Sequence, residues 1–337
     1  MSGTRVMATL TAPMIADHEL IGRMRRAGMD GVRINSAHVT PSQLKEMTAA
    51  LRDIDPKIVI LMDTKGPEMR TTALPVPVVF ADGDLMAIVS DTADRPSSAG
   101  CIRINVPDLH LHLSPGQRLQ FDDGAIMAEV TAVDGETVKA RVTCGGTLGS
   151  RKTMNADGFD SRYLPAVSLR DEMNIRAVIE AGIDIIAHSF VRSADDVAAV
   201  KALAGDSGVK VYAKIECTPA IERMDEIINA ADGILVARGD LGTAVDPCRI
   251  PVIQADAIMR CRRAGRRTIL ATQIMQSMID SPRPTRAEIS DIALGVFEGA
   301  DWLLLCGETA QGHYPAECVE IMRRTIMETE KSKWKID

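Results

Sequence analysis

The chain has 337 residues, of which 46% are hydrophobic and 25% charged, and its 39 Lys and Arg against 46 Asp and Glu give a formal net charge of −7. This is the composition of a globular protein, and it excludes a disordered, collagen-like or low-complexity chain. The acidic balance and an aromatic content of 3% argue against a nucleic-acid surface, an anionic-membrane surface or a base-stacking platform, so we expect a small-molecule site.

Short β-branched runs alternate with longer amphipathic stretches, the pattern of βα units around a parallel sheet. The candidate strands are 5–10, 31–35, 58–63, 183–188, 210–215, 233–237, 267–271 and 301–306. The candidate helices that follow them are 16–27, 41–53, 171–182, 193–204, 218–230, 249–264, 285–299 and 315–330. Eight such units predict an α/β fold of the (β/α)8 TIM-barrel type.

The alternation is interrupted once, between Thr72 and Gly158, where short strands separated by Asp-Gly turns indicate an all-β segment. We therefore predict a catalytic barrel of residues 1–71 and 159–337, with a small β domain of residues 72–158 inserted after the third strand. An insertion at that point would overhang the C-terminal mouth of the barrel, where it could act as a lid that excludes water.

Two of the predicted helices begin with capping-box spacing. Ser193 precedes Asp196, and Thr285 precedes Glu288. In a capping box the hydroxyl accepts a backbone amide of the first turn, and the acidic side chain reaches back to the capping residue. This spacing predicts that Ser193 and Thr285 cap the helices that follow them.

No targeting or membrane segment is evident in the sequence. No apolar run approaches the roughly 20 residues that span a bilayer, and the first residues lack the pattern of a signal peptide. We therefore expect a cytoplasmic protein. The 7 cysteines are widely spaced and form no C-x-x-C pair, which predicts neither disulfides nor a zinc ribbon.

Polar side chains follow the ends of most candidate strands. Residues two apart on a strand point to the same side, so three pairs are expected to face the barrel mouth together. These pairs are Arg33 with Asn35, Asp63 with Lys65, and Lys214 with Glu216. Further polar groups at strand ends are Ser189, Arg238, Asp240, Thr272, Gln273 and Glu308. Because the strand ends of a barrel meet at one face, the sequence predicts one site there, with Ser189 among the substrate-binding residues.

The types of these residues favour a phosphoryl-transfer reaction. Glu216 and Asp240 are carboxylates from adjacent strands, and Mg²⁺ (or Mn²⁺) is commonly held by one or two carboxylates together with substrate oxygens. Arg33, Arg70 and Lys214 are cations suited to phosphoryl oxygens. No G-x-x-x-x-G-K-[ST] run occurs, and no G-x-G-x-x-G opens a helix after a strand, which excludes a P-loop site and a Rossmann site.

Six runs of the sequence resemble pyruvate kinase: GMDGVRINSAH, ILMDTKGPEMRT, VYAKIE, DGILVARGDLG, ATQIMQSMIDSPRPTRAEISD and GETAQGHYP. The resemblance covers nearly the whole chain and is weakest across the inserted segment. It implies a barrel that carries the site, an insert that forms a mobile lid, and the Mg²⁺-dependent glycolytic reaction of phosphoenolpyruvate with ADP to give pyruvate and ATP.

The resemblance also implies roles for matching positions. Lys214 and Arg33 would contact the transferred phosphoryl group with support from Arg70, and Thr272 would lie in the pocket that delivers a proton to the enolate carbon. The backbone around Ala237 and Gly239 would bind the substrate carboxylate, and Glu216 and Asp240 would bind Mg²⁺. Asn35, Asp63 and Thr64 would bind a monovalent cation, and Glu68 corresponds to the glutamate of potassium-dependent members. The nucleotide would bind near His38 and Pro13.

The chain departs from the family pattern at several positions. Ala37 replaces the serine that is the fourth monovalent-cation ligand, and because a methyl group cannot coordinate, the sequence leaves potassium dependence open. Cys306 replaces a serine, and His188 replaces a small residue. Thr72 and residues 155–158 differ at the two connections to the insert. The sequence ends just after the eighth helix, from which we expect neither the family's C-terminal domain nor its effector site.

Two other functions stay open at this point. A Mg²⁺-dependent lyase or decarboxylase that forms the enolate of a pyruvate-type substrate would need the same carboxylates but no phosphate transfer. A barrel without catalysis would act as a binding partner. For the enzyme we expect phosphoenolpyruvate or pyruvate and ADP or ATP as partners, no nucleic acid, no membrane, and a possible homo-oligomer.

Overall fold

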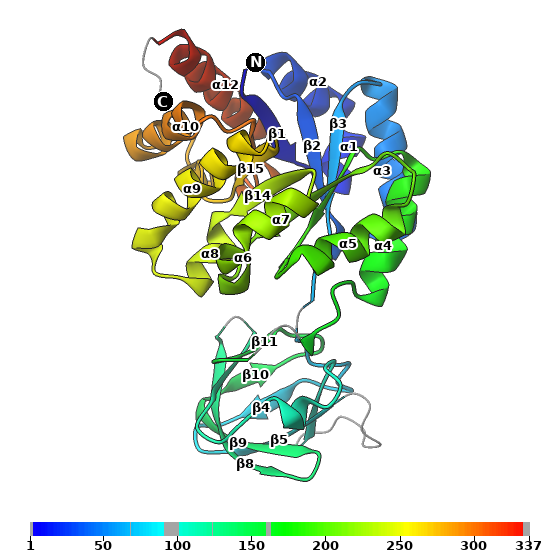
Figure 1. Ribbon diagram of the computed structural model, residues 1–337, viewed down its shortest axis with the longest axis vertical. Helices are drawn as coiled ribbons and strands as arrows, with labels where there is room; N and C mark the ends of the chain where they lie inside the picture. The colour runs from blue at the N-terminus through cyan, green and yellow to red at the C-terminus, as the bar shows by residue number, and fades with distance from the viewer. Residues whose placement is uncertain (1–2, 68, 91–100, 123, 160–162, 333–337) are drawn as a thin grey trace. The chain divides into compact units, whose positions relative to one another are not determined.

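The structure is a computed structural model that describes residues 3–67, 69–90, 101–122, 124–159 and 163–332, apart from the side chains of His38 and Leu169 (Figure 1). The chain divides into two compact units, one formed by Met1–Gly66 with Ala166–Asp337 and the other by Pro67–Pro165. The second unit begins five residues before the expected insertion and ends seven after it. Arg70 and Thr71 belong to it because they already form β-bridges with Thr153 and Ile104.

Eight parallel strands close a barrel in the first unit, in the order β1-β16-β15-β14-β13-β12-β3-β2. The predicted (β/α)8 barrel is therefore confirmed, and each strand lies within two residues of its predicted bounds. The barrel strands are β1 (Arg5–Thr9), β2 (Gly31–Asn35), β3 (Val59–Asp63), β12 (Ile185–His188), β13 (Lys210–Ile215), β14 (Gly233–Ala237), β15 (Arg267–Ala271) and β16 (Trp302–Leu305).

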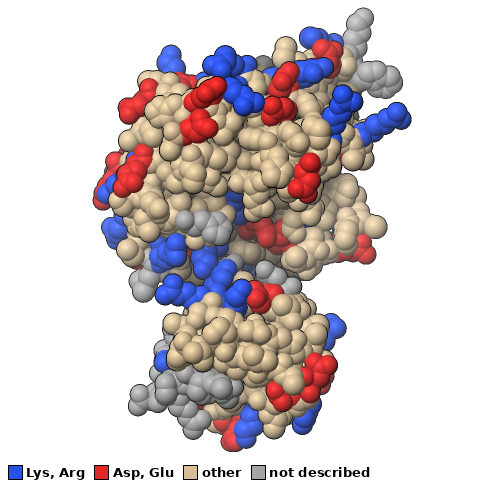
Figure 2. Space-filling model, turned by 180° about the vertical axis from the view of Figure 1, so that it is seen from behind, with Lys and Arg blue, Asp and Glu red and all other residues tan. Residues whose placement is uncertain are grey.

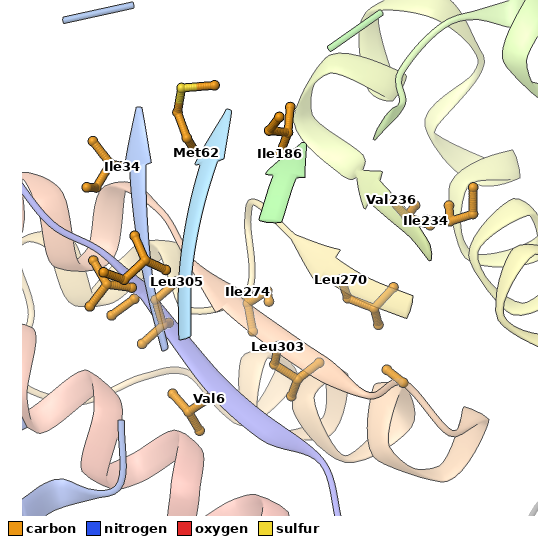
Figure 3. Close-up of a cluster of buried hydrophobic side chains, with 14 of the residues drawn as sticks. Val6, Ile34, Met62, Ile186, Ile234, Val236, Leu270, Ile274, Leu303 and Leu305 are labelled. Atoms are coloured by element: carbon orange, nitrogen blue, oxygen red, sulfur yellow. The ribbon is translucent and has the colours of Figure 1, made fainter. Parts of the chain in front are cut away.

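Each barrel strand is buried on both faces, which explains its nearly continuous hydrophobic sequence. One set of side chains fills the barrel interior and includes Met7, Leu61 and Trp302. The alternate set faces the surrounding helices, where Val6, Ile34, Met62, Ile186, Ile234, Val236, Leu270 and Leu303 extend outward from seven of the strands (Figure 3). The polar residues at the strand ends are thus carried on a rigid, fully packed base.

The helices surround the barrel (Figure 1). They are α1 (Ala12–Ala16), α2 (His18–Ala27), α3 (Pro41–Ile54), α4 (Leu169–Ala181), α5 (Ala194–Ala204), α6 (Thr218–Glu222), α7 (Met224–Ala230), α8 (Arg238–Ala244), α9 (Ile250–Arg263), α10 (Arg286–Glu298), α11 (Gly307–Ala310) and α12 (Pro315–Lys331). Short 3₁₀ helices are η1 (Ser36–His38), η2 (Leu109–Leu111), η4 (Pro247–Arg249) and η5 (Gln276–Ile279).

One helix that the sequence predicted as continuous is divided. Arg223, at φ −109° and ψ 24°, separates α6 from α7, so the prediction of a single helix over 218–230 is wrong about continuity. The helix predicted over 16–27 is α2, which begins two residues later because Asp17 leaves helical geometry and its side chain accepts the amide of Leu20. The sequence did not predict the short α1 that precedes it.

The two predicted capping boxes have different outcomes. Thr285 and Glu288 form a complete box at the start of α10, as predicted. Ser193 precedes α5 but its side chain caps no amide, so the capping box predicted there is wrong. The reason is an ion pair, because the Asp196 carboxylate accepts both the backbone amide and the guanidinium of Arg192, each at 2.8 Å.

The second unit is built of strands, in agreement with the predicted all-β segment. A six-stranded sheet has the order β11-β7-β8-β9-β5-β6, and β10 pairs with β4 in a separate two-stranded sheet. The strands are β4 (Val78–Phe80), β5 (Leu85–Ser90), β6 (Cys101–Ile104), β7 (Arg118–Phe121), β8 (Ile126–Asp134), β9 (Thr137–Cys144), β10 (Gly146–Leu148) and β11 (Met154–Ala156). They enclose a hydrophobic core of their own, which includes Phe80, Ile88 and Phe121.

Asp171, near the start of α4, ties together the two places where the barrel unit is interrupted. Its carboxylate accepts the backbone amides of Lys65 at 2.7 Å and Gly66 at 3.1 Å, and also the hydroxyl of Ser168 at 2.8 Å. Residue 171 is fully buried. The barrel residues before and after the insertion are therefore held by one carboxylate that belongs to the barrel itself.

In the described ranges, no helix combines the length and the apolar character needed to cross a membrane.

On the face that Figure 2 shows, acidic and basic side chains are interspersed on both units. On that face, the charge of the chain is not separated into one acidic and one basic region.

Candidate active site

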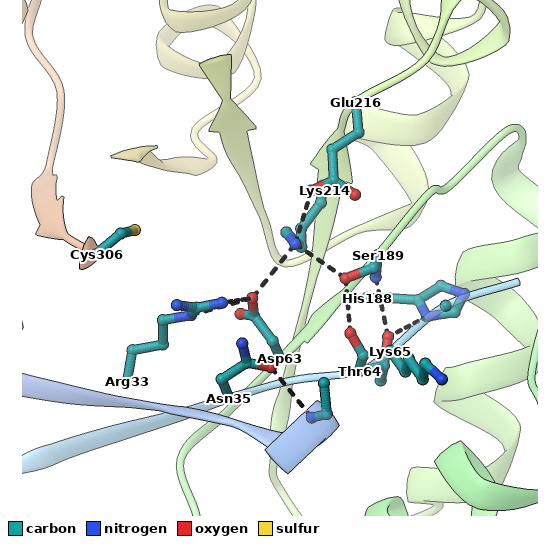
Figure 4. A network of polar contacts seen from close by, with 12 residues as sticks. Arg33, Asn35, Asp63, Thr64, Lys65, His188, Ser189, Lys214, Glu216 and Cys306 are labelled. Atoms are coloured by element: carbon teal, nitrogen blue, oxygen red, sulfur yellow. Dashed lines mark hydrogen bonds and ion pairs between the residues drawn. The ribbon is translucent and has the colours of Figure 1, made fainter. Parts of the chain in front are cut away.

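Polar side chains from four neighbouring strands converge at the C-terminal ends of β2, β3, β12 and β13 (Figure 4). Arg33 comes from β2, Asp63 is the last residue of β3, and Ser189 follows β12. Lys214 lies near the end of β13, and Glu216 directly follows that strand. The convergence of these residues was predicted from the periodicity of the strands.

Asp63 is the centre of a buried charge cluster. Its Oδ2 lies 2.6 Å from Arg33 Nη2 and 3.3 Å from Lys214 Nζ, and Lys214 Nζ lies 2.7 Å from Glu216 Oε1. The side chains of Asp63 and Glu216 are 4% and 0% exposed, so the cluster is shielded from water. The Lys214 ammonium points into the site, as the predicted mechanism requires.

The charges of the cluster shift the pKa values of its members. Burial opposes ionisation of Asp63, but Arg33 and Lys214 outweigh burial and lower the pKa of Asp63 below its ordinary value. Burial likewise opposes the charge of Lys214, but Asp63 and Glu216 raise its pKa above the ordinary value. Burial raises the pKa of Glu216 to about 7; Asp240 adds to this rise and Lys214 opposes it. Lys214 is therefore firmly charged, whereas Glu216 lacks full compensation.

A hydrogen-bond chain holds the lysine from the other side. Lys214 Nζ donates to Ser189 Oγ at 2.9 Å, and Ser189 Oγ donates to the carbonyl of Thr64 at 2.7 Å. Thr64 Oγ1 accepts the amide of Ser189 and lies 3.1 Å from Nδ1 of His188 (Figure 4). His188, one of the departures from the family pattern, is therefore part of the support of Lys214.

The donors present fit a divalent cation. Arg33 and Lys214 supply two positive charges, whereas Asp63, Glu216 and Asp240 supply three negative ones, which leaves the cluster with an excess of negative charge. Among the described residues, no three His, Cys, Asp or Glu side chains are arranged to hold a metal. Two carboxylates completed by substrate oxygens and water are the donor set typical of Mg²⁺, and Glu216 and Asp240 are near enough for the charge of Asp240 to raise the pKa of Glu216.

The residues expected to hold a monovalent cation fit it only in part. Asp63 Oδ1 is buried and has no hydrogen-bond partner in the part of the chain that the structure describes. Asn35 Oδ1, however, accepts the amide of Ala37 at 3.1 Å, and the Thr64 carbonyl accepts Ser189 Oγ. Ala37 offers no side-chain oxygen. The described residues therefore offer only an incomplete donor set for a monovalent cation.

Thr272 lies beside the turn that follows β14. Its Oγ1 accepts the amide of Gly239 at 2.6 Å, and Ala237 is the last residue of β14. Thr272 and the next residue, Gln273, have left-handed backbone conformations with φ of 68° and 54°. The structure therefore places Thr272 against Gly239, two residues after the end of β14 at Ala237.

The other predicted site residues are Arg70, Pro13, His38 and Glu68. Arg70 belongs to the second unit, where Nη1 donates to the carbonyl of Arg151 and the backbone amide donates to Asn105 Oδ1. Pro13 is exposed in the first turn of α1. The side chain of His38 and the whole of Glu68 lie outside the described residues.

Cys306 occupies a position beside the cluster (Figure 4). Burial raises the pKa of its thiol, against the effect of the nearby Arg33 charge. A thiol with a raised pKa stays protonated near neutral pH and is a poor nucleophile. These properties favour the interpretation of Cys306 as a small, half-buried packing residue and not as a nucleophile.

The sequence did not reveal how the charged residues pair. Asp63 was expected only as a cation ligand, yet it binds both Arg33 and Lys214. The signal that was available is the alternation of the strands, which aims Arg33, Asp63 and Lys214 at one point from three strands. Arg238 and Glu308 were expected at the barrel mouth without a role, and both bind the backbone around Thr272.

The chain matches a family model described as pyruvate kinase, barrel domain, over residues 1–319. It is 37% identical to human pyruvate kinase PKLR over 344 residues, which cover 97% of this chain and 60% of that protein. It is 36% identical to the pyruvate kinase of Dictyostelium discoideum, covering 97% of this chain and 66% of the relative, and 37% identical to that of Geobacillus stearothermophilus, covering 98% and 57%. The chain therefore spans about three-fifths of the length of these relatives.

Proposed function

The chain belongs to the pyruvate kinase family, and from this premise we propose that it catalyses Mg²⁺-dependent phosphoryl transfer from phosphoenolpyruvate to ADP, which yields pyruvate and ATP. The observation that carries the proposal is the buried cluster of Arg33, Asp63, Lys214 and Glu216 at the mouth of the barrel. Two fixed cations beside uncompensated carboxylates suit a reaction in which negative charge moves between phosphoryl oxygens. For an enzyme that acts on these substrates, we propose a cytoplasmic location.

Lys214 and Arg33 are proposed to bind the phosphoryl group that is transferred. Lys214 Nζ is held by Asp63, Glu216 and Ser189, so little movement is needed when charge develops on the substrate. Such preorganised charge in a dry site stabilises a transition state more than mobile charge in water does. Arg70, from the second unit, is proposed as a further contact of the same group.

Glu216 and Asp240 are proposed to hold Mg²⁺, which when bound supplies positive charge to the oxygens of the substrate. Burial and the charge of Asp240 raise the pKa of Glu216, so a bound cation would favour the carboxylate form that ligation needs. Asn35, Asp63 and Thr64 are proposed as ligands of a monovalent cation. Ala37 supplies no fourth side-chain oxygen, so the assay below is run with and without potassium.

The remaining contacts follow the family positions. The backbone around Ala237 and Gly239 is proposed to bind the substrate carboxylate, and Thr272 to hold the proton that is delivered to the enolate carbon after transfer. Pro13 and His38 are proposed to lie on the nucleotide side.

The test is pyruvate formation from phosphoenolpyruvate and ADP by the purified chain with Mg²⁺, measured with and without potassium. We expect activity that requires both Mg²⁺ and ADP, and a loss of about 10²–10³-fold in kcat for Lys214→Met, as for other preorganised electrostatic groups. Lys201→Met is the matched control, because Lys201 pairs with Asp232 outside the site.

A chain that leaves phosphoenolpyruvate and ADP unchanged would contradict the proposal. Exchange of the methyl protons of pyruvate in that same chain, without any effect of nucleotide, would instead indicate an enolate-forming lyase or decarboxylase. Binding of phosphoenolpyruvate without either reaction would indicate a non-catalytic member of the family.

A further inference from the structure

The backbone at Thr272 and Gln273 adopts a conformation that these residue types disfavour. Their φ values of 68° and 54° place two consecutive non-glycine residues in the left-handed region, and Thr272 is β-branched. Such residues clash with their own backbone there, and they keep the conformation only where surrounding groups hold it. The structure must therefore contain groups that fix this turn.

Arg238 holds the carbonyl side of the turn. Its Nε and Nη2 donate to the Thr272 carbonyl at 3.2 and 3.0 Å, and Nη2 also donates to the Gln273 carbonyl at 3.0 Å. Nη1 binds Asp291 Oδ1 at 2.7 Å and Gln254 Oε1 at 3.3 Å. These five contacts match the five N–H groups of a guanidinium, so Arg238 has no donor left for an anionic substrate.

Glu308 holds the amide side of the same turn. Its Oε1 accepts the backbone amides of Ile274 at 3.2 Å and Met275 at 3.0 Å, and its Oε2 accepts the amide of Cys306 at 2.8 Å. Glu308 is fully buried. Four consecutive residues, 272 to 275, are thus bound through their backbones by one arginine at the start of α8 and one glutamate in α11.

We propose that Arg238 and Glu308 are positioning residues that fix Thr272, so that its hydroxyl is presented where the reaction needs a proton. The proposal rests on the proposed function, in which Thr272 serves proton delivery. Thr272 Oγ1 meets the Gly239 amide at 2.6 Å, and Gly239 directly follows Arg238. One short segment therefore sets both the backbone and the side chain of Thr272.

The first test compares Arg238→Met with Arg323→Met. Arg323 is a matched control, because its guanidinium also donates to backbone carbonyls, those of Gly28 and Thr4, and also pairs with Asp30, but it lies at the other end of the barrel. We expect Arg238→Met to lower kcat about 10²-fold, the loss typical of a misplaced reacting group, with KM for phosphoenolpyruvate changed less than about threefold. An equal loss of kcat in both variants, or no loss in a folded Arg238→Met protein, would overturn the proposal.

The second test asks whether Arg238 acts through Thr272. If it does, Arg238→Met combined with Thr272→Ala loses no more kcat than Thr272→Ala alone, to within about twofold, because both changes remove the same contribution. Arg238→Lys, which keeps the charge but not the planar fork, should restore only a small part of the activity. Independent losses that multiply in the double variant would show that Arg238 acts elsewhere.

The third test does not depend on activity. Hydrogen exchange at the amides of Ile274 and Met275 should be about tenfold faster or more in Arg238→Met, because local opening of the turn becomes easier. In Arg323→Met these amides should exchange as in the parent. Unchanged exchange in Arg238→Met would refute the positioning role even if the parent chain had no kinase activity, so the two proposals fail separately.

Discussion

The histidine at position 188 makes the stability of the barrel depend on pH in a way that can be calculated. His188 is fully buried at the end of β12, and Thr64 Oγ1 lies 3.1 Å from its Nδ1. Burial lowers the pKa of His188 to about 4 from 6.5; the positive charges of Arg192 and Lys214 add to this effect, and Asp196 opposes it. A neutral imidazole can accept the hydrogen of the Thr64 hydroxyl, and a protonated one cannot.

The direction of the effect follows from which state binds the proton. Between pH 6.5 and about 4, the unfolded chain is protonated at His188 while the folded chain is not, so the free energy of unfolding falls as the pH falls through this window. Each unit of pKa difference is worth about 1.4 kcal/mol, so the full loss is about 3 kcal/mol. Between about pH 7.5 and pH 5 the loss is about 2 kcal/mol.

The assay is chemical denaturation at these two pH values, followed by the fluorescence of Trp302, which is buried inside the barrel. A Trp334→Phe background leaves Trp302 as the only tryptophan, since the chain has 2. His188→Gln keeps an acceptor for Thr64 but has no proton to gain, so its free energy of unfolding should lack this loss. His18→Gln, at an exposed position at the start of α2, should behave as the parent. Parallel pH dependences of the parent and His188→Gln would refute the argument.

Three further predictions follow from the barrel. A Cβ at Gly233 would lie 2.5 Å from Tyr212 Cε2, so Gly233→Ala should destabilise the chain by about 1–3 kcal/mol in thermal denaturation, and an unchanged melting temperature would contradict the packing described. Glu216→Gln should weaken Mg²⁺ binding measured by calorimetry, without lowering the melting temperature of the metal-free chain, because it removes a buried charge; equal Mg²⁺ affinity would argue against Glu216 as a ligand. Asp196→Asn should reduce the free energy of unfolding at neutral pH by about 1.5–3 kcal/mol, because it removes the negative charge from the buried, charge-assisted hydrogen bonds between Asp196 and Arg192. Since Arg192 lowers the pKa of Asp196 against the effect of burial, this difference should shrink only below about pH 4.

The barrel strands were predictable because their side chains are buried on both faces. A run such as residues 233–237 has no polar residue to interrupt it, and its alternation with amphipathic stretches indicates a strand in the interior of an α/β protein. The helices were predictable where hydrophobic spacing and caps agree, as at Thr285. The break at Arg223 has no such local signal, and the cap at Ser193 was lost to an ion pair that local spacing does not reveal.

The composition of the site was predictable, but its internal contacts were not. Arg33 and Asp63 are 30 residues apart, and the pairing of β2 with β3 brings their side chains within 2.6 Å. Arg238 and Glu308 are also far apart in the sequence, and both bind the backbone of the turn at residues 272–275. The alternation of side chains along a strand predicts which way each side chain points. Which partner it contacts depends on how the neighbouring strands are aligned.

The pairing of β3 with β12 has a consequence for the order of events during synthesis. Leu61 is aligned with Ile185, so this strand pair joins segments more than a hundred residues apart in the sequence. The partner of β1 is β16, which is synthesised later still. The strands of the second unit, in contrast, pair among themselves and need nothing that is translated later. We expect the β unit to fold first on the ribosome, while β1 and β3 each keep one edge unpaired and open to chaperones until β16 and β12, respectively, have been synthesised.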